Sequence, residues 1–104
     1  MPMKEIEELK EQFVEKLSPV QIYIFGSYAE GTQKEDSDFD FYIIVNDENR
    51  NIKKLTIEAY KSIREIKKRP VDIIVGTKER FETRKRIPSV EYEVANKGVL
   101  IYGE

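Results

Sequence analysis

Apolar residues at intervals of three and four predict two amphipathic helices. The first helix carries its apolar positions at Ile6, Leu9, Phe13 and Leu17. It is expected to end at the Ser18-Pro19 step, because the residue before a proline is pushed out of the α region. The second helix carries its apolar positions at Ile52, Leu55, Ala59, Ile63 and Ile66. Each helix therefore has one apolar face that must pack against another element.

Short apolar runs rich in branched side chains predict the strands. The first run covers residues 20–25 and is closed by a glycine, and the second covers 38–45 and leads into the polar turn 46–49. The third run, residues 71–75, is apolar except for one acid, and we expect it to be a central strand that stops at Gly76. Residues 99–102 could add a strand at an edge of the sheet.

The remaining segments connect these elements. A short helix is expected from Ser27, followed by a polar loop over residues 33–37. The charged segment 78–86 is expected to be helical, and Pro88-Ser89 offers the start of a last helix that Gly98 would end. The predicted fold is a small α/β (α+β) domain spanning residues 1–104, with a mixed sheet of about four strands and helices packed on it.

Composition limits the possible functions. The 104 residues are 39% hydrophobic and 37% charged, and 18 basic against 20 acidic residues give a net charge of −2. This near balance gives no general attraction to nucleic acid or to an anionic membrane. No apolar run approaches the ~20 residues that cross a bilayer, and the N-terminal segment is charged, unlike a signal sequence. We therefore expect a soluble, cytoplasmic protein.

Two absent residue types limit the chemistry further. The chain has no cysteine and no histidine. A thiolate nucleophile, a zinc–sulfur site and an imidazole base are therefore excluded. Only oxygen ligands remain, so a bound metal would be a hard cation such as Mg²⁺ or Mn²⁺.

The chemistry is concentrated between residues 26 and 40. Gly26 and Ser27 follow the first apolar run, and Gly26 would let the backbone approach a phosphate group while Ser27 donates its hydroxyl. Asp38 and Asp40 begin the second run, and residues two apart in a strand point to the same face. Two neighbouring carboxylates repel each other, and a divalent cation would relieve that repulsion. The pattern predicts a nucleoside triphosphate held together with its metal.

A third acid is expected at the same place. Asp72 lies in the otherwise apolar run 71–75, where an unpaired ionised carboxylate would be costly to bury. If this strand lies beside the strand 38–45, Asp72 shares a face with Asp38 and Asp40. The three carboxylates would then form a metal cluster suited to phosphoryl-type transfer.

Purely structural readings compete with each of these predictions. Gly26-Ser27 could be an ordinary turn with a serine cap, the two aspartates could be solvated, and Asp72 could pair with Lys68 or Arg69. Two further groups have uncertain roles. One is a basic cluster that could reach phosphates or an acidic partner but would more often be the solvated side of a helix, Lys78, Arg80, Arg84, Lys85 and Arg86. The other is a set of tyrosines that could stack on a base but would more often pack in the core or at its rim, Tyr23, Tyr28, Tyr42 and Tyr60.

The motif resembles the signature of the nucleotidyltransferase superfamily whose fold is shared with DNA polymerase beta. The similarity rests on Gly26-Ser27, ten intervening residues, Asp38-Phe39-Asp40, and an acid within residues 71–75. The short length, the context of residues 37–41 and the ending 95–102 are most similar to the minimal nucleotidyltransferases, the MNT group. Glu30 departs from the pattern, because many relatives carry a basic residue there.

The resemblance implies roles for the motif residues. Asp38, Asp40 and Asp72 would hold the metal ions, with Asp72 helping to activate the acceptor hydroxyl, and Gly26 and Ser27 would bind the triphosphate of ATP. The reaction would attack the α-phosphate, transfer AMP and release pyrophosphate. Minimal members commonly pair with a HEPN-domain toxin, and some add AMP to a tyrosine of that toxin. The resemblance thus predicts an antitoxin whose partner is a HEPN-type protein.

Three functions remain open from the sequence. The first is transfer of a nucleotide to a partner protein. The second is an antitoxin that neutralises its partner by occlusion without catalysis. The third is transfer to a small molecule or an RNA end with the help of another subunit.

Overall fold

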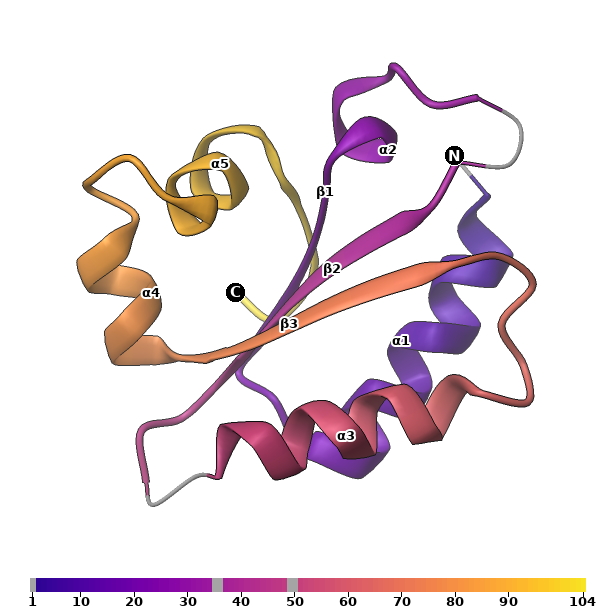
Figure 1. The fold of residues 1–104 in the computed structure, drawn as a ribbon, viewed down its shortest axis with the longest axis horizontal. Coiled ribbons are helices and arrows are strands. Elements are labelled where there is room, and N and C mark those ends of the chain that lie inside the picture. The colour runs from indigo at the N-terminus through magenta and orange to yellow at the C-terminus, as the bar shows by residue number, and fades with distance from the viewer. Residues whose placement is uncertain (1, 35–36, 49–50) are drawn as a thin grey trace.

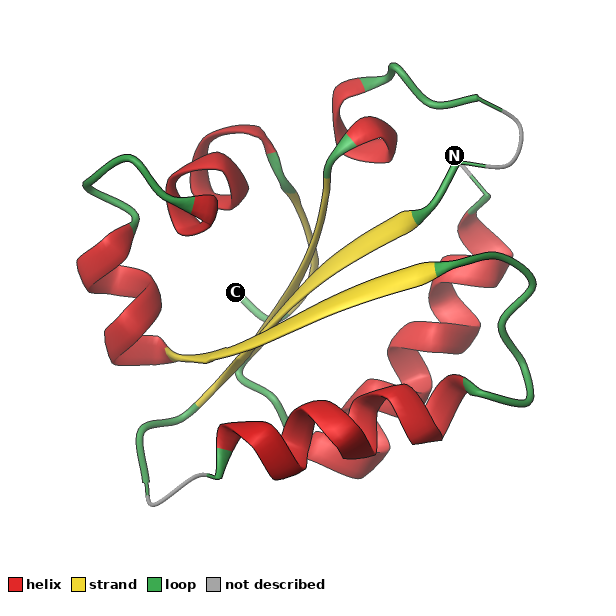
Figure 2. Cartoon of the chain, viewed as in Figure 1, coloured by secondary structure: helices red, strands yellow, loops and turns green. Residues whose placement is uncertain are grey.

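The computed structural model describes residues 2–34, 37–48 and 51–104, and within them the chain forms five helices and four strands (Figure 1; Figure 2). The helices are α1 (Met3–Leu17), α2 (Ser27–Glu30), α3 (Ile52–Ile63), α4 (Lys78–Arg84) and α5 (Val90–Lys97). The strands are β1 (Gln21–Phe25), β2 (Phe39–Val45), β3 (Val71–Thr77) and β4 (Val99–Tyr102). The predicted α/β class and the strand number are confirmed, and the architecture is that of a polymerase-beta-like nucleotidyltransferase fold.

The four strands form one mixed sheet in the order β3-β2-β1-β4. β1 runs antiparallel to both of its neighbours, and β2 runs parallel to β3. The prediction of a central strand over residues 71–75 is wrong, because β3 lies at the edge of the sheet. Its outer side is partly covered by α3, whose Tyr60 hydroxyl accepts a hydrogen bond from the Ile73 amide at 2.9 Å.

The main core lies between the sheet and the pair α1 and α3, which cover the same face (Figure 1). Alternation along β2 sends Phe39, Phe41 and Ile43 into this core, where all three are fully buried. The Phe41 ring meets Phe13 of α1 edge-on, with 5.2 Å between the ring centroids. Burying apolar rings and branched side chains on this face supplies most of the stabilisation of such a fold.

A smaller core lies on the other face, under α4 and α5. Tyr42, Ile44, Phe81 and Val94 are buried there, and the Tyr42 ring packs 5.4 Å from Phe81 of α4. These two helices lie toward the end of the sheet where β2 and β3 finish, away from the starts of those strands (Figure 2). The starts of β2 and β3 are therefore left uncovered by α4 and α5 on this face.

Several predicted boundaries shift by a few residues. β2 begins at Phe39, one residue after the expected start, and β3 continues through Gly76 to Thr77. Helices α3 and α4 end at Ile63 and Arg84, short of the expected ends at residues 66 and 86. Parts of the predicted loop 33–37 and turn 46–49 lie outside the described residues. None of the described helices is long and apolar enough to cross a membrane.

The last helix follows its sequence signals closely. The Ser89 side chain accepts a hydrogen bond from the Tyr92 amide and caps the start of α5. Gly98 follows the last turn, as expected, and its amide bonds to the Val94 carbonyl at 2.9 Å. Gly98 has extended backbone there, with φ −76° and ψ 164°, so the chain passes directly into β4.

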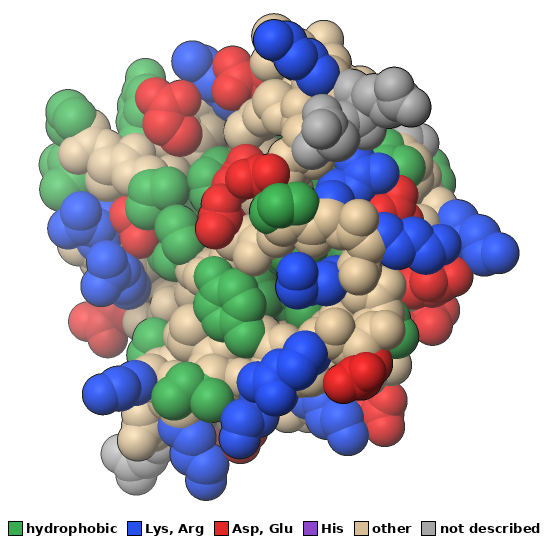
Figure 3. Space-filling model, turned by 45° about the vertical axis from the view of Figure 1, so that its right-hand side comes forward, with side chains coloured by type: hydrophobic (Ala, Val, Ile, Leu, Met, Phe, Trp, Pro, Cys, Tyr) green, Lys and Arg blue, Asp and Glu red, His purple; other side chains and the backbone are tan. Residues whose placement is uncertain are grey.

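The face drawn in Figure 3 carries acidic side chains near its centre, and basic side chains are spread over both its upper and lower parts.

Candidate functional site

Three side chains form a row across one end of the sheet. Asp40 on β2 is the register partner of Phe25 on β1 and of Asp72 on β3. Residues that pair across neighbouring strands point to the same face. Asp40 and Asp72 therefore stand side by side on the face left open by α4 and α5, as the sequence predicts for neighbouring strands.

Partial burial and the neighbouring carboxyl groups raise the pKa of Asp40. Partial burial, the Asp72 charge and the Asp38 charge raise the pKa of Asp40 to about 6, and the Asp40 and Asp72 carboxyl groups are close enough to share a hydrogen bond. Asp38 lies just before β2 begins and acts on Asp40 through its charge. The expected cost of burial falls on Asp40, because Asp72 is exposed at the edge of the sheet.

No basic side chain neutralises this acidic group within the described part of the chain. Neither Asp40 nor Asp72 forms an ion pair with a lysine or arginine of residues 2–34, 37–48 and 51–104. Arg69, considered above as a partner for Asp72, instead binds Glu5 at 2.7 Å. The structural reading of Asp72 as half of a salt bridge is therefore wrong, and the negative charge of the site is uncompensated.

The glycine turn packs directly against Asp40. Gly26 has a φ of +74°, a conformation that side-chain-bearing residues rarely adopt, and a Cβ placed on it would lie 2.4 Å from Asp40 Oδ2. Glycine is thus required here for two reasons, backbone conformation and space. The turn that precedes α2 and the carboxylate on β2 form one continuous surface.

Ser27 begins α2 immediately after this turn. Amide N–H groups in the first turn of a helix have no carbonyl partner within the helix and attract anions. Across the described residues, the Ser27 hydroxyl also has no hydrogen-bond partner. Ser27 and the first amides of α2 directly follow the glycine that packs against Asp40, an arrangement that suits binding of a phosphate chain.

The donor set fits a hard divalent cation. All its side-chain atoms are oxygens, its charge is unbalanced, and a cation would reverse the upward shift of the Asp40 pKa. Within the described residues, no three acidic side chains are arranged so that they could hold a metal ion by themselves. That Asp38, Asp40 and Asp72 are ligands of a cation stays a prediction.

A second polar cluster lies further along the same face and was not predicted. Glu91 in the first turn of α5 is fully buried and accepts hydrogen bonds from Tyr42 at 2.7 Å, Arg84 at 3.0 Å and Arg80 at 3.2 Å. Burial by itself would raise the pKa of Glu91, but these hydrogen bonds outweigh it and lower the pKa to about 2. The cluster ties α4 and α5 to the sheet. Tyr42 also lies against Gly76, where a Cβ would come within 2.4 Å of its hydroxyl.

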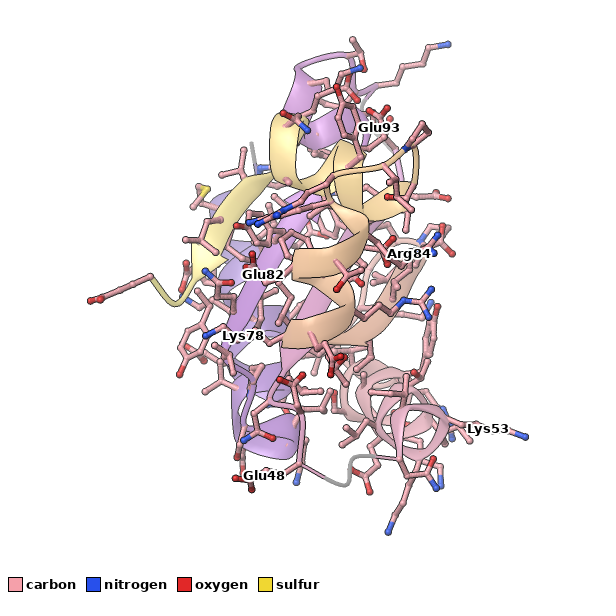
Figure 4. All side chains as sticks on the ribbon, turned by 90° about the vertical axis from the view of Figure 1, so that its left-hand side faces the viewer. Glu48, Lys53, Lys78, Glu82, Arg84 and Glu93 are labelled. Carbon is pink, nitrogen blue, oxygen red and sulfur yellow. The ribbon has the colours of Figure 1, made fainter. Side chains whose placement is uncertain are left out.

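The four tyrosines and part of the basic cluster named above take part in packing or ion-pair contacts. Tyr42 and Tyr28 are buried, Tyr23 stacks on Phe81 at 5.6 Å, and Tyr60 covers the β3 edge. In the basic cluster, Arg80 and Arg84 hold Glu91, and Lys85 pairs with Glu82 of the same helix at 2.7 Å. Figure 4 looks onto α4, with Lys78, Glu82 and Arg84 along it. These contacts favour a structural role for Arg80, Arg84 and Lys85.

A sequence profile of the nucleotidyltransferase domain matches residues 6–101. The chain belongs to the nucleotidyltransferase domain family. The match includes the turn at Gly26 and the carboxylates of β2 and β3, so the geometry described above lies within the family domain. No curated protein matches the chain.

Solved structures of a putative nucleotidyltransferase and of toxin–antitoxin proteins share the fold. A putative nucleotidyltransferase from Sulfolobus solfataricus aligns over 97% of this chain and 79% of its own, with 20% identity and a TM-score of 0.62. A toxin–antitoxin structure with AMP-PNP aligns over 100% of this chain and 75% of its own, with 23% identity and a TM-score of 0.56. A toxin–antitoxin MntA–HpeT variant, with two aspartates changed to glutamate, aligns over 100% and 75%, with 21% identity and a TM-score of 0.55.

Proposed function

We propose that this nucleotidyltransferase transfers AMP from ATP to a hydroxyl group of a partner protein, with Mg²⁺ or Mn²⁺ as its metal. The observation that carries the proposal is the contact between the Gly26 turn and Asp40, with Asp72 alongside. This contact joins a phosphate-binding turn to an uncompensated carboxylate group. Neither half alone would distinguish catalysis from an ordinary turn or a solvated acid.

The triphosphate is positioned by the start of α2. The glycine at position 26 leaves the phosphate chain free to approach the backbone, and the Ser27 hydroxyl and the first amides of α2 donate hydrogen bonds to phosphate oxygens. Fixed donors aimed at a phosphate chain are most of what phosphoryl-type transfer needs from a protein. Asp40, which contacts this turn, would help to hold a cation that neutralises charge on the phosphate chain.

The carboxylates serve the metal and the acceptor. Asp38, Asp40 and Asp72 would hold the cation, which when bound neutralises phosphate charge and makes the acceptor hydroxyl more acidic. Asp72 accepts the proton of the acceptor hydroxyl while the oxygen of that hydroxyl attacks the α-phosphorus. One phosphorus–oxygen bond forms, the bond between the α-phosphorus and the bridging oxygen breaks, and pyrophosphate leaves with that oxygen.

The acceptor comes from another molecule. Asp72 is exposed at the edge of the sheet, and α4 and α5 do not cover the starts of β2 and β3. The acidic group is thus reachable from outside, as transfer to a protein hydroxyl requires. The toxin–antitoxin structures with this fold, one of them with AMP-PNP, support a role as an antitoxin. The HEPN-type partner and the tyrosine as acceptor belong to the proposal and rest on the resemblance of the motif to the minimal nucleotidyltransferases.

Label transfer tests the proposal directly. The purified chain, a HEPN-type partner and α-labelled ATP are combined with Mg²⁺ or Mn²⁺, and the partner is examined for covalent label. The variant carrying Asp38→Asn with Asp40→Asn should lose transfer by at least about a hundredfold, because a carboxamide is a poor ligand for a hard cation. Glu11→Gln is the matched control, because Glu11 is exposed on α1 away from the site.

The other functions predict different results. Undiminished neutralisation of the partner by the double variant would favour occlusion over catalysis. Label recovered in RNA or in a small molecule, and not in the partner, would favour the third function. Activity that survives removal of all divalent cations would contradict the metal-dependent mechanism.

A further inference from the structure

Arg69 connects three parts of the chain that surround the candidate site. It stands just before Pro70 and β3, and its side chain is only 15% exposed. Two of its nitrogens bind both carboxylate oxygens of Glu5 on α1, with Nε to Oε1 at 3.0 Å and Nη2 to Oε2 at 2.7 Å. A paired contact of this kind fixes the plane of the guanidinium group as well as its position.

The same guanidinium reaches the phosphate-binding helix. Its Nη1 donates a hydrogen bond to the hydroxyl of Tyr28, the residue that follows Ser27 in α2. The guanidinium carbon lies 5.4 Å from the centre of the Tyr28 ring and 4.5 Å from that of Phe39, which begins β2. The two rings are 4.9 Å apart, so α2, the arginine and β2 form one packed unit.

Arg69 also contacts the segment that leads into the acidic group. Nη1 lies 3.4 Å from the carbonyl oxygen of Ser37, the residue before Asp38. Ser37 is itself held in place, because its hydroxyl accepts a hydrogen bond from the Lys34 amide at 2.7 Å. Pro70, next to Arg69, accepts a hydrogen bond from the Phe39 amide at 3.2 Å. The arginine therefore stands between the turn of Ser27 and the start of the strand that carries Asp40.

We propose that Arg69 is a positioning residue that holds the triphosphate half of the site at a fixed distance from the carboxylate half. This inference rests on the proposed function, because the proposed function assigns the triphosphate to the start of α2 and the metal ion to the carboxylates. α2 has only four residues and no basic side chain, so its direction depends on contacts such as the one at Tyr28. A lysine could not replace Arg69, since its single ammonium group cannot bind a carboxylate with two nitrogens and also reach both Tyr28 and Ser37.

The proposal predicts a loss of coupling between two ligands. In the parent protein, Mn²⁺ should strengthen the binding of α,β-methylene ATP, an analogue that cannot release pyrophosphate. In Arg69→Lys and in Tyr28→Phe this strengthening should fall by about tenfold, while binding of the analogue without metal changes little. Tyr28→Phe keeps the ring and removes only the hydroxyl. It therefore tests the contact even if Arg69→Lys fails to fold.

Arg84→Lys is the matched control. It makes the same chemical change in an arginine that also holds a glutamate, Glu91 of α5, and that has no contact with Tyr28 or Glu5 among the described residues. It should lower stability without changing the coupling. Titration calorimetry with and without Mn²⁺ measures the coupling, and urea denaturation measures stability. Equal coupling in the parent, Arg69→Lys and Tyr28→Phe proteins would overturn the proposal and leave Arg69 a structural residue.

The results also separate this inference from the proposed function. A parent protein that shows coupling but transfers no label would refute the proposed function. The role of Arg69 would then still be supported if the coupling is lost in Arg69→Lys and Tyr28→Phe. Transfer by the parent with unchanged coupling in both variants would refute only the role of Arg69. A parent protein in which Mn²⁺ does not strengthen analogue binding would overturn the role of Arg69 as well.

Discussion

Replacing Asp40 with asparagine should make the metal-free protein more stable while abolishing transfer. The structure raises the pKa of Asp40 from its ordinary value of 3.8 to about 6. The folded state therefore binds the proton more tightly than the unfolded state does, so the folded protein loses stability as the pH rises from about 4 to about 6. Above that range the ionised group opposes folding, and Asp40→Asn removes the opposition.

The size of the effect follows from the shift. A change of about two pKa units corresponds to roughly 3 kcal/mol of free energy of unfolding if the site were fully shielded from solvent. Asp40 is only partly buried, so we reduce this to about 1 to 2 kcal/mol. For a protein of this size, such a gain raises the melting temperature by at least about 4 °C.

The assay is thermal and urea denaturation of the parent, Asp40→Asn and Glu11→Gln proteins across the acid and neutral range. The advantage of Asp40→Asn should vanish below about pH 4, where the parent carboxyl group is protonated, and reach its full size above about pH 6. Excess Mg²⁺ at neutral pH should stabilise the parent and not the variant. A variant that is less stable than the parent at neutral pH without metal would refute the reasoning.

Three further predictions follow from other contacts. Gly26→Ala should lower the free energy of unfolding, measured by urea denaturation, by about 2 kcal/mol or more, and it should abolish Mn²⁺ binding. Gly31 has the same φ of +74° but no atom within 4 Å of an added Cβ, so Gly31→Ala should lower the free energy of unfolding by only about 1 kcal/mol and keep Mn²⁺ binding. Glu91→Gln should lower the free energy of unfolding by about 3 kcal/mol at neutral pH, and this difference from the parent should shrink as the pH falls from 4.5 towards about 2. A difference that stays constant with pH would contradict the lowered pKa of Glu91. Tyr60→Phe should speed hydrogen exchange of the Ile73 amide and leave exchange in β1 unchanged, as NMR would show.

The sequence allows much of the site to be predicted because strand alternation needs no tertiary information. Asp40 and Asp72 share a face, as expected, once their strands are neighbours. The burial of Asp72 could not be judged in the same way. Residues 71–75 are apolar enough for a central strand. An edge strand can have an equally apolar sequence when a helix covers its outer side, as α3 does here. Burial therefore depends on strand order, which local sequence does not specify.

The Glu91 cluster could not be predicted, since its members come from β2, α4 and α5. In the sequence, Glu91 is one acid among twenty, and Arg80 and Arg84 look like the solvated side of a charged helix. Only the packing of α5 on the sheet brings Glu91 under Tyr42. Residues whose partners are distant in sequence give no periodic signal, whatever their importance.

The contact between Gly26 and Asp40 makes two separate positions of the motif depend on each other. Any side chain at position 26 would occupy the space that the Asp40 carboxylate now fills. In a descendant that had replaced Asp40 with a smaller residue, position 26 would be released from its steric restriction, though not from its unusual backbone angle. Loss of the acid should therefore be followed by drift at the glycine. Joint loss at these two positions would mark family members that retain the fold but no longer perform the chemistry.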